Sequence, residues 1–135
     1  MNTIKLVGFD EQFLKTIKDY KKMHLKPREC VVYTITFDDK KAGVIGFKIK
    51  ENNHYFLKIG IHQDFRGRGI FDRALNLLVK QHKITKIYST IANANIASVK
   101  AHKKVGFRSI SKAREANLKQ QGLLLKRNTR LVKHF

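Results

Sequence analysis

The chain has little of what secreted and membrane proteins depend on. Its 135 residues include one cysteine, one proline and no tryptophan. Cys30 has no second cysteine with which to form an internal disulfide, which favours a reducing compartment. No apolar run approaches the length of a membrane-spanning helix, and the N-terminal residues do not resemble a signal peptide. We therefore expect a soluble, cytoplasmic protein that does not enter a membrane.

Acidic residues are also scarce. Ten Asp and Glu residues stand against 29 Lys and Arg residues, so the formal net charge is +19. From Arg73 onward there are 15 Lys and Arg residues and one acid, Glu115. This charge favours a polyanionic partner such as RNA, DNA, the ribosome or an acidic protein face. A lysine-rich proteome bias explains it equally well, because lysine dominates and aromatic residues are not interleaved with the basic positions.

The remaining composition is typical of one globular domain. Hydrophobic residues make up 42% of the chain, with nine Phe and four Tyr, which is enough to build a core. Repeats, low-complexity stretches and Pro/Gly-rich linkers are lacking, so we predict a single domain over residues 1–135. The six histidines show no metal-ligand spacing, and one cysteine cannot build a thiolate site, so no metal is expected.

Hydrophobic periodicity predicts alternating strands and helices. Strands are expected at residues 3–9, 30–37, 42–50, 54–61, 84–91, 107–111 and 123–132. Helices are expected at residues 10–22 with Asp10 as N-cap, at 71–81, and at 96–105 with Ala97, Ala101 and Val105 as the packed face. Residues 112–121 are polar and predict a loop or a poorly anchored helix. This order predicts an α/β fold, a mixed sheet with helices on both faces.

The most informative segment is residues 61–71, Ile-His-Gln-Asp-Phe-Arg-Gly-Arg-Gly-Ile-Phe. It joins a predicted strand to a predicted helix. Two glycines separated by one residue at such a junction expose several backbone N–H groups, and the helix macrodipole lies behind them. This arrangement is typical of a phosphate-binding loop, and Arg66 and Arg68 add positive charge to it. A second patterned segment, residues 95–107, follows about thirty residues later.

These two segments resemble the GNAT superfamily of acetyl-coenzyme A-dependent N-acyltransferases. Residues 66–70 are similar to the family's pyrophosphate loop, Gln/Arg-x-x-Gly-x-Gly/Ala. Residues 95–107 are similar to its later motif, Asn-x-x-Ala/Ser-x-x-x-Tyr/His-x-x-x-Gly-Phe. Order and separation both match, and the resemblance covers roughly residues 54–110. Phe71 departs from the loop pattern, which ends in Gly or Ala, and His102 stands where many members have Tyr.

The resemblance implies a GNAT-like mixed central sheet in which the strands at 54–61 and 84–90 are a splayed parallel pair. It implies acetyl-coenzyme A as cosubstrate, with the pantetheine arm between these strands, and transfer of the acetyl group to a primary amine by direct attack. Backbone N–H groups around Gly60 and Ile61 would stabilise the oxyanion. The chain would be a monomer or a homodimer. The residues assigned to the coenzyme are Ile59, Gly60, Ile61, Arg66, Gly67, Arg68, Gly69, Ile70, Phe71, Asp72, Asn95, Ser98 and His102.

The resemblance also places His102 beside the coenzyme sulfur. An imidazolium with a pKa near neutrality could donate a proton to the departing thiolate, so His102 is the candidate general acid. A surface histidine beside Lys103 and Lys104 is the structural alternative. Asn95 would bond the pantetheine or cap its helix.

The sequence does not identify the general base. No Glu lies in the strand at 84–91, where Thr90 occupies a position that some relatives give to an acid. The candidates are His54 or Tyr55 at the start of the preceding strand. A water relay could also remove the proton, as could one of three further side chains, His62, Asp64 and Glu51.

The acceptor is equally open. The basic composition favours an amine associated with nucleic acid, such as a ribosomal protein, a tRNA-linked amine or a base amine. A small-molecule amine such as a polyamine is disfavoured, because such cations usually need an acidic pocket. A non-catalytic coenzyme-binding or nucleic-acid-binding module on the same fold is the alternative of a different class, supported by Phe71 and the lack of an obvious base.

Overall fold

The computed structural model describes residues 2–135, and these form two compact units that meet in sequence after Ile84. The single domain predicted from composition stays a prediction. None of the helices within residues 2–135 is long and apolar enough to cross a membrane. The first unit contains β1 (Ile4–Gly8), α1 (Glu11–Leu14), η1 (Tyr20–Met23), η2 (Pro27–Glu29), β2 (Val31–Phe37), β3 (Lys40–Lys50), β4 (His54–Ile61), η3 (Gln63–Phe65) and α2 (Ile70–His82). The second unit contains β5 (Lys86–Ala92), α3 (Ile96–Lys104), β6 (Arg108–Ser109), α4 (Lys112–Gln120) and β7 (Asn128–His134).

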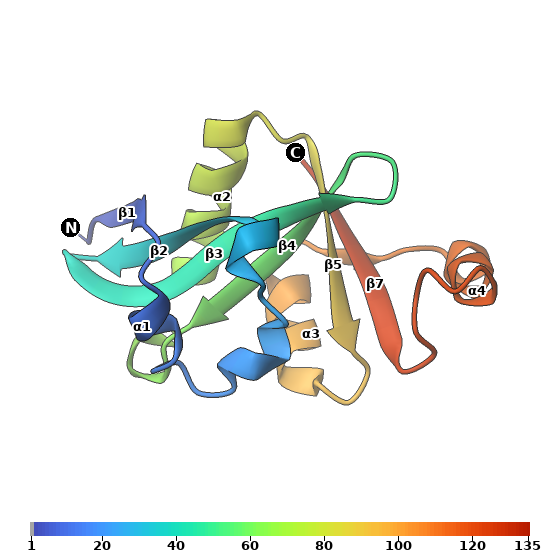
Figure 1. The fold of residues 1–135 in the computed structure, drawn as a ribbon, viewed down its shortest axis with the longest axis horizontal. Helices are drawn as coiled ribbons and strands as arrows, with labels where there is room; N and C mark the ends of the chain where they lie inside the picture. The colour runs from blue at the N-terminus through green and yellow to red at the C-terminus, as the bar shows by residue number, and fades with distance from the viewer. Residues whose placement is uncertain (1) are drawn as a thin grey trace. The chain divides into compact units, whose positions relative to one another are not determined.

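Strands β1 to β4 of the first unit pair antiparallel in chain order (Figure 1). Tight turns join β2 to β3 and β3 to β4. Asp38 and Asp39 have φ values of 49° and 65°, and the three residues 51–53 also have positive φ. Asp and Asn tolerate this left-handed conformation better than other residues with a side chain, and it suits tight hairpins. Strand β3 begins at Lys40, two residues before the predicted start, because the turn needs only two residues.

Helices cover both faces of this sheet. On one face the Phe47 ring of β3 meets the His82 ring of α2, with centroids 5.0 Å apart. On the other face Val44 packs in a buried cluster with Leu14 and Ile17, from α1 and the segment after it. Neighbouring residues in a strand point to opposite faces, so odd-numbered residues of β3 face α2 and even-numbered residues face the α1–η1 segment.

The first predicted helix is wrong beyond Leu14. Asp10 caps it as expected, because its carboxylate accepts from the Phe13 N–H at 3.1 Å. The helix then ends after four residues, and Asp19 has a left-handed φ of 64°. The backbone at residues 16 and 18 bonds instead to a side chain from η3, which is described with the site below.

In the second unit β7 pairs antiparallel with both β5 and β6. Strand β7 begins at Asn128 and not at residue 123, because Gly122 turns the chain with a φ of 75° and the Asn128 N–H closes a turn onto Leu125 O. The polar segment at 112–121 is a helix, α4, capped by the Ser111 hydroxyl. The sequence of strands and helices confirms the α/β class.

The predicted packed face of α3 is wrong. Ala97 and Ala101 are exposed, and Val105 is only half-buried. The one fully buried side chain that α3 contributes among the described residues is His102, with 4% of its surface exposed. A histidine therefore does the packing that the periodicity assigned to alanines.

Candidate active site

The loop before α2 has the open backbone that the sequence predicted. Gly67 and Gly69 have φ values of 79° and 71°, in the left-handed region that favours glycine. A Cβ added at either position would meet no atom of residues 2–135 within 4 Å. Gly69 is also the N-cap of α2 and has no side chain with which to bond the first N–H groups. These N–H groups, backed by the dipole of a 13-residue helix, are left to bind an anion.

The first turn of α2 contributes backbone more than side chains. Ile70 is 2% exposed and anchors the helix in the core, so only its N–H can serve a ligand. Phe71 is half-buried, and Asp72 is exposed. A carboxylate in the first turn is favourable to the helix dipole but repels an incoming phosphate. The loop therefore depends on its N–H groups and on nearby cations.

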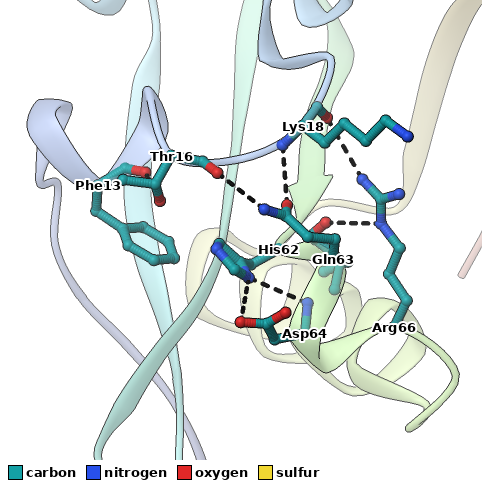
Figure 2. Close-up of polar contacts among 8 residues, drawn as sticks. Phe13, Thr16, Lys18, His62, Gln63, Asp64 and Arg66 are labelled. Atoms are coloured by element: carbon teal, nitrogen blue, oxygen red, sulfur yellow. Dashed lines mark hydrogen bonds and ion pairs between the residues drawn. The ribbon is translucent and has the colours of Figure 1, made fainter.

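Both loop arginines have partners inside the first unit. Arg66 Nε donates to Ile61 O at 3.0 Å, which ties the loop to the end of β4 (Figure 2). The Arg68 guanidinium lies over the rings of Phe37 and Phe65, 5.7 and 5.3 Å from their centroids. A cation–π contact at an exposed site contributes only about 0.5–1 kcal/mol, so a phosphate can compete with it. Arg68 is therefore the better candidate for a phosphate contact, whereas Arg66 holds the loop in place.

The hydrogen-bond pattern of β4 decides which backbone groups face away from β3. The His62 N–H donates to Ala42 O at 2.7 Å, so these residues are a hydrogen-bonded pair. Such pairs alternate along an antiparallel ladder, so Gly60 also bonds to β3. Ile59 and Ile61 direct their N–H and C=O groups to the opposite edge. Of the two predicted oxyanion donors, the Ile61 N–H is the one that β3 does not use.

The predicted residues of the second unit lie along α3, from its N-cap to its last turn. Asn95 is the N-cap residue, and its Oδ1 accepts from the Ser98 N–H at 3.3 Å. The helix-capping role is therefore what the described contacts show for Asn95. The Ser98 carbonyl oxygen lies 2.8 Å from His102 Nδ1. Ser98 thus links the cap to the buried histidine one turn later.

His102 is held as a neutral imidazole. A carbonyl oxygen only accepts, so Nδ1 carries the hydrogen that it donates to Ser98 O. Nε2 then has a lone pair, which accepts from the Ser89 hydroxyl of β5 at 2.9 Å. Burial lowers the pKa of His102 from 6.5 to about 4, against the bond to Ser98 O, which raises it. This pKa lies below the near-neutral value on which the general-acid role was based, and that role stays a prediction.

The sequence matches the acetyltransferase (GNAT) family over residues 3–107. The chain belongs to the acetyltransferase (GNAT) family. No curated protein sequence matches it.

Many solved structures share the GNAT fold with this chain. An acetyltransferase from Salmonella typhimurium that modifies the N-terminal serine of a 50S ribosomal subunit protein aligns with a TM-score of 0.71 and 18% identity, over 98% of this chain and 95% of that one. An IAA acetyltransferase from Bacillus cereus aligns with a TM-score of 0.67 and 15% identity over 100% of both chains. The Bacillus subtilis acetyltransferase in complex with CoA aligns with a TM-score of 0.67 and 16% identity, over 100% of this chain and 99% of that one. At these identities the likeness shows the fold, which confirms the predicted GNAT-like architecture.

The two candidate bases lie at the opposite end of β4 from Ile61, and their role stays a prediction. Tyr55 packs edge-to-face on Phe47, with centroids 5.1 Å apart, on the α2 face of the sheet. His54 is its neighbour in β4 and points to the other face. Ile61 lies six or seven residues farther along the strand, roughly 20 Å away at the rise of a β-strand. Neither side chain can reach an amine beside the Ile61 N–H without relaying waters.

Sequence reasoning missed Gln63, which joins two distant parts of the first unit (Figure 2). Its Oε1 accepts from the Lys18 N–H at 2.9 Å, and its Nε2 donates to Thr16 O at 3.2 Å. Arg66 Nη2 lies 3.4 Å from Lys18 O. These bonds replace the helix predicted at residues 15–22. No local pattern signals such a contact, because it joins residues about 45 positions apart.

His62 and Asp64, two of the further candidates for the base, form a local turn in the same network. The Asp64 N–H donates to His62 Nδ1 at 3.1 Å, and the Asp64 carboxylate lies 3.7 Å from that nitrogen (Figure 2). The His62 ring stacks on Phe13, with centroids 5.8 Å apart. These contacts make His62 an N-cap for η3. Within residues 2–135 no group of three His, Cys, Asp or Glu side chains could hold a metal ion.

Proposed function

We propose that this GNAT protein is an N-acetyltransferase that moves the acetyl group of acetyl-coenzyme A to a primary amine by direct attack. The observation that carries the proposal is the uncapped N-terminus of α2 behind two left-handed glycines. A pyrophosphate fits there, because nothing in the described chain fills the space beside the glycines and the N–H groups need acceptors. Two structures of similar fold contain the coenzyme. The Bacillus subtilis acetyltransferase was solved in complex with CoA, and a putative streptothricin acetyltransferase from Bacillus anthracis was solved in complex with acetyl coenzyme A.

The chain's own groups would share the work as follows. Acetyl-coenzyme A, when bound, supplies the thioester that the amine attacks. The Ile61 N–H, which β3 does not use, donates to the oxyanion that forms. Asn95 and Ser98 set the position of α3. His102 would hold α3 to β5 through Ser89, because its buried neutral ring has no proton on Nε2 to give. The coenzyme thiolate is a tolerable leaving group, so a general acid at this point assists but is not obligatory.

The acceptor is proposed from charge. A net charge of +19 exceeds what a coenzyme with a few phosphates needs. It supports an acceptor that is anionic or attached to nucleic acid, and one structural relative modifies a ribosomal protein. Acetylation in the reducing interior of the cell agrees with the single Cys30.

Two glycine variants test the coenzyme site. Gly69→Ala and Gly122→Ala both place a Cβ on a left-handed residue with open space around it, so both lose about 1 kcal/mol of stability. Only Gly69 adjoins the proposed phosphate site. We expect Gly69→Ala to weaken acetyl-coenzyme A binding at least about tenfold by calorimetry, because a Cβ holds phosphate oxygens away from the backbone. Equal affinity in the two variants would refute the site, and absence of amine-dependent thiol release in wild type would refute the enzyme.

A further inference from the structure

Three lysines share one face of the β3–β4 hairpin. Lys48 and Lys50 are two residues apart on β3, so their side chains project from the same face. Lys58 of β4 is opposite Gly46, two residues before Lys48, and facing residues of antiparallel strands project together. This is the face away from α2. We call these three residues the lysine cluster.

The lysine cluster is only partly neutralised by the chain. Glu29 Oε1 lies 3.2 Å from Lys48 Nζ, and Glu51 Oε2 lies 3.9 Å from Lys50 Nζ. Lys58 is half-buried, yet it makes no ion pair with any carboxylate that the described part of the chain contains. Lys48 and Lys50 each lie beside a carboxylate, whereas the half-buried Lys58 does not.

An ammonium in this position has an unfavourable environment. Burial, and after it the charges of Lys50 and Lys48, lower the pKa of Lys58, while Cys30 acts in the opposite direction. Lys50 lies over the Phe56 ring, 4.7 Å from its centroid, so its ammonium stays close to the hairpin. A compact oxyanion at Lys58 would supply the missing counter-charge and bond to ammonium donors.

The lysine cluster lies close to the proposed chemistry along β4. Lys58 is three residues before Ile61, a separation of roughly 10 Å at the rise of a strand. On this face Met23 packs over Gly60, which lies between Lys58 and Ile61, so an acceptor would pass beside the Met23 side chain. Phosphates of the coenzyme are expected at the start of α2, which packs on the opposite face. An anion at the cluster would therefore belong to the second substrate.

We propose that the lysine cluster binds a carboxylate or phosphate carried by the acceptor itself, so that the acceptor is a small anionic amine. This rests on the proposed acetyl transfer and narrows its acceptor. In such an acceptor a few bonds separate the amine from the carboxylate or phosphate, and the long, flexible Lys58 side chain can cover the rest of the distance to the Ile61 N–H. A nucleic-acid-linked acceptor is the competing result.

Matched amines and a matched lysine test the proposal. We compare phosphoethanolamine with ethanolamine, and β-alanine with its amide, by thiol release from acetyl-coenzyme A at constant ionic strength. The anionic amines should give kcat/KM at least about tenfold higher. Lys58→Met should raise their KM about tenfold and remove this preference. Lys40→Met, at the exposed far end of β3, should change neither. The affinity for acetyl-coenzyme A should be the same in all three proteins.

Equal use of neutral and anionic amines would overturn the proposal, and so would turnover only of amines on RNA. A readout independent of catalysis separates this failure from failure of the proposed function. Inorganic phosphate is titrated into the protein saturated with CoA while the Lys58 and Lys40 side-chain NMR signals are followed. The proposal requires the Lys58 signal to respond first and saturably. A Lys58 signal that moves no more than that of Lys40 overturns it, whether or not the enzyme transfers acetyl groups.

Discussion

Neutral His102 makes the stability of this protein depend on pH in a defined window. The unfolded chain takes up a proton on this imidazole near its ordinary pKa of 6.5, whereas the folded chain does so only at about 4. Between these values unfolding binds a proton, so the free energy of unfolding falls as the pH falls. The stabilisation is fully present above about 6.5 and is lost on the way to about 4.

The size of the effect follows from the two pKa values. A separation from 6.5 to about 4 corresponds to about 3 kcal/mol in full. About 2 kcal/mol of this is lost between about pH 8 and about pH 5. The loss arises because protonation would place a charge in a site that is only 4% exposed and would break the bond that Nε2 accepts from Ser89.

Urea unfolding of wild type and His102→Gln near pH 8 and near pH 5 measures this loss of stability. The penalty of the variant should be about 2 kcal/mol smaller near pH 5 than near pH 8, because wild type alone loses the stabilisation. His134→Gln, at an exposed histidine, should run parallel to wild type. Parallel curves for wild type and His102→Gln would refute the reasoning. If the variant does not fold, NMR titration of the His102 ring replaces it, and a midpoint near 6.5 would be the refuting result.

Two further variants, each with a control, test the backbone packing of the first unit. Gly46→Ala should destabilise the protein by about 3 kcal/mol in urea unfolding, because its Cβ would overlap the backbone carbonyl oxygen of Val31. Gly8→Ala is the control and should be near neutral, because its Cβ meets nothing in the described residues within 4 Å. Equal losses of stability in the two variants would contradict this reasoning. Gln63→Ala should speed amide exchange at Lys18 with a stability loss of about 1 kcal/mol or less, because it removes two exposed hydrogen bonds. Gln120→Ala is its control, and unchanged exchange at Lys18 in Gln63→Ala would show that the amide does not hold the segment.

Local signals predicted the parts of the fold that local chemistry decides. The strand at 54–61 was placed with its observed bounds, since alternation ends at turn residues on one side and at the glycine loop on the other. The left-handed conformation of Gly67 and Gly69 agrees with a prediction made from two glycines at a strand-to-helix junction together with the second motif at residues 95–107. The Asp10 cap was also predicted correctly, because a helix cap depends on a side chain and a backbone N–H only three residues apart.

Errors arose where a distant residue decided the outcome. Residues 15–22 have helical periodicity, but Gln63 occupies the backbone groups that a helix would need. Periodicity predicted that small apolar residues form the inner face of α3. In the structure His102 is buried there instead, because it forms a hydrogen bond with Ser89 of β5. That burial also changes the chemistry, because a motif specifies an imidazole but not its surroundings. The general base could not be read from sequence for the same reason.

The amide of Gln63 touches only main-chain atoms of the segment that it holds. Lys18 and Thr16 contribute an N–H and a carbonyl oxygen, which every residue except proline also offers. The exposed side chains of Thr16 and Lys18 can therefore be replaced without loss of these two bonds, whereas Ile17 between them is fixed by its place in the core. The single replacement that this arrangement forbids is proline at position 18.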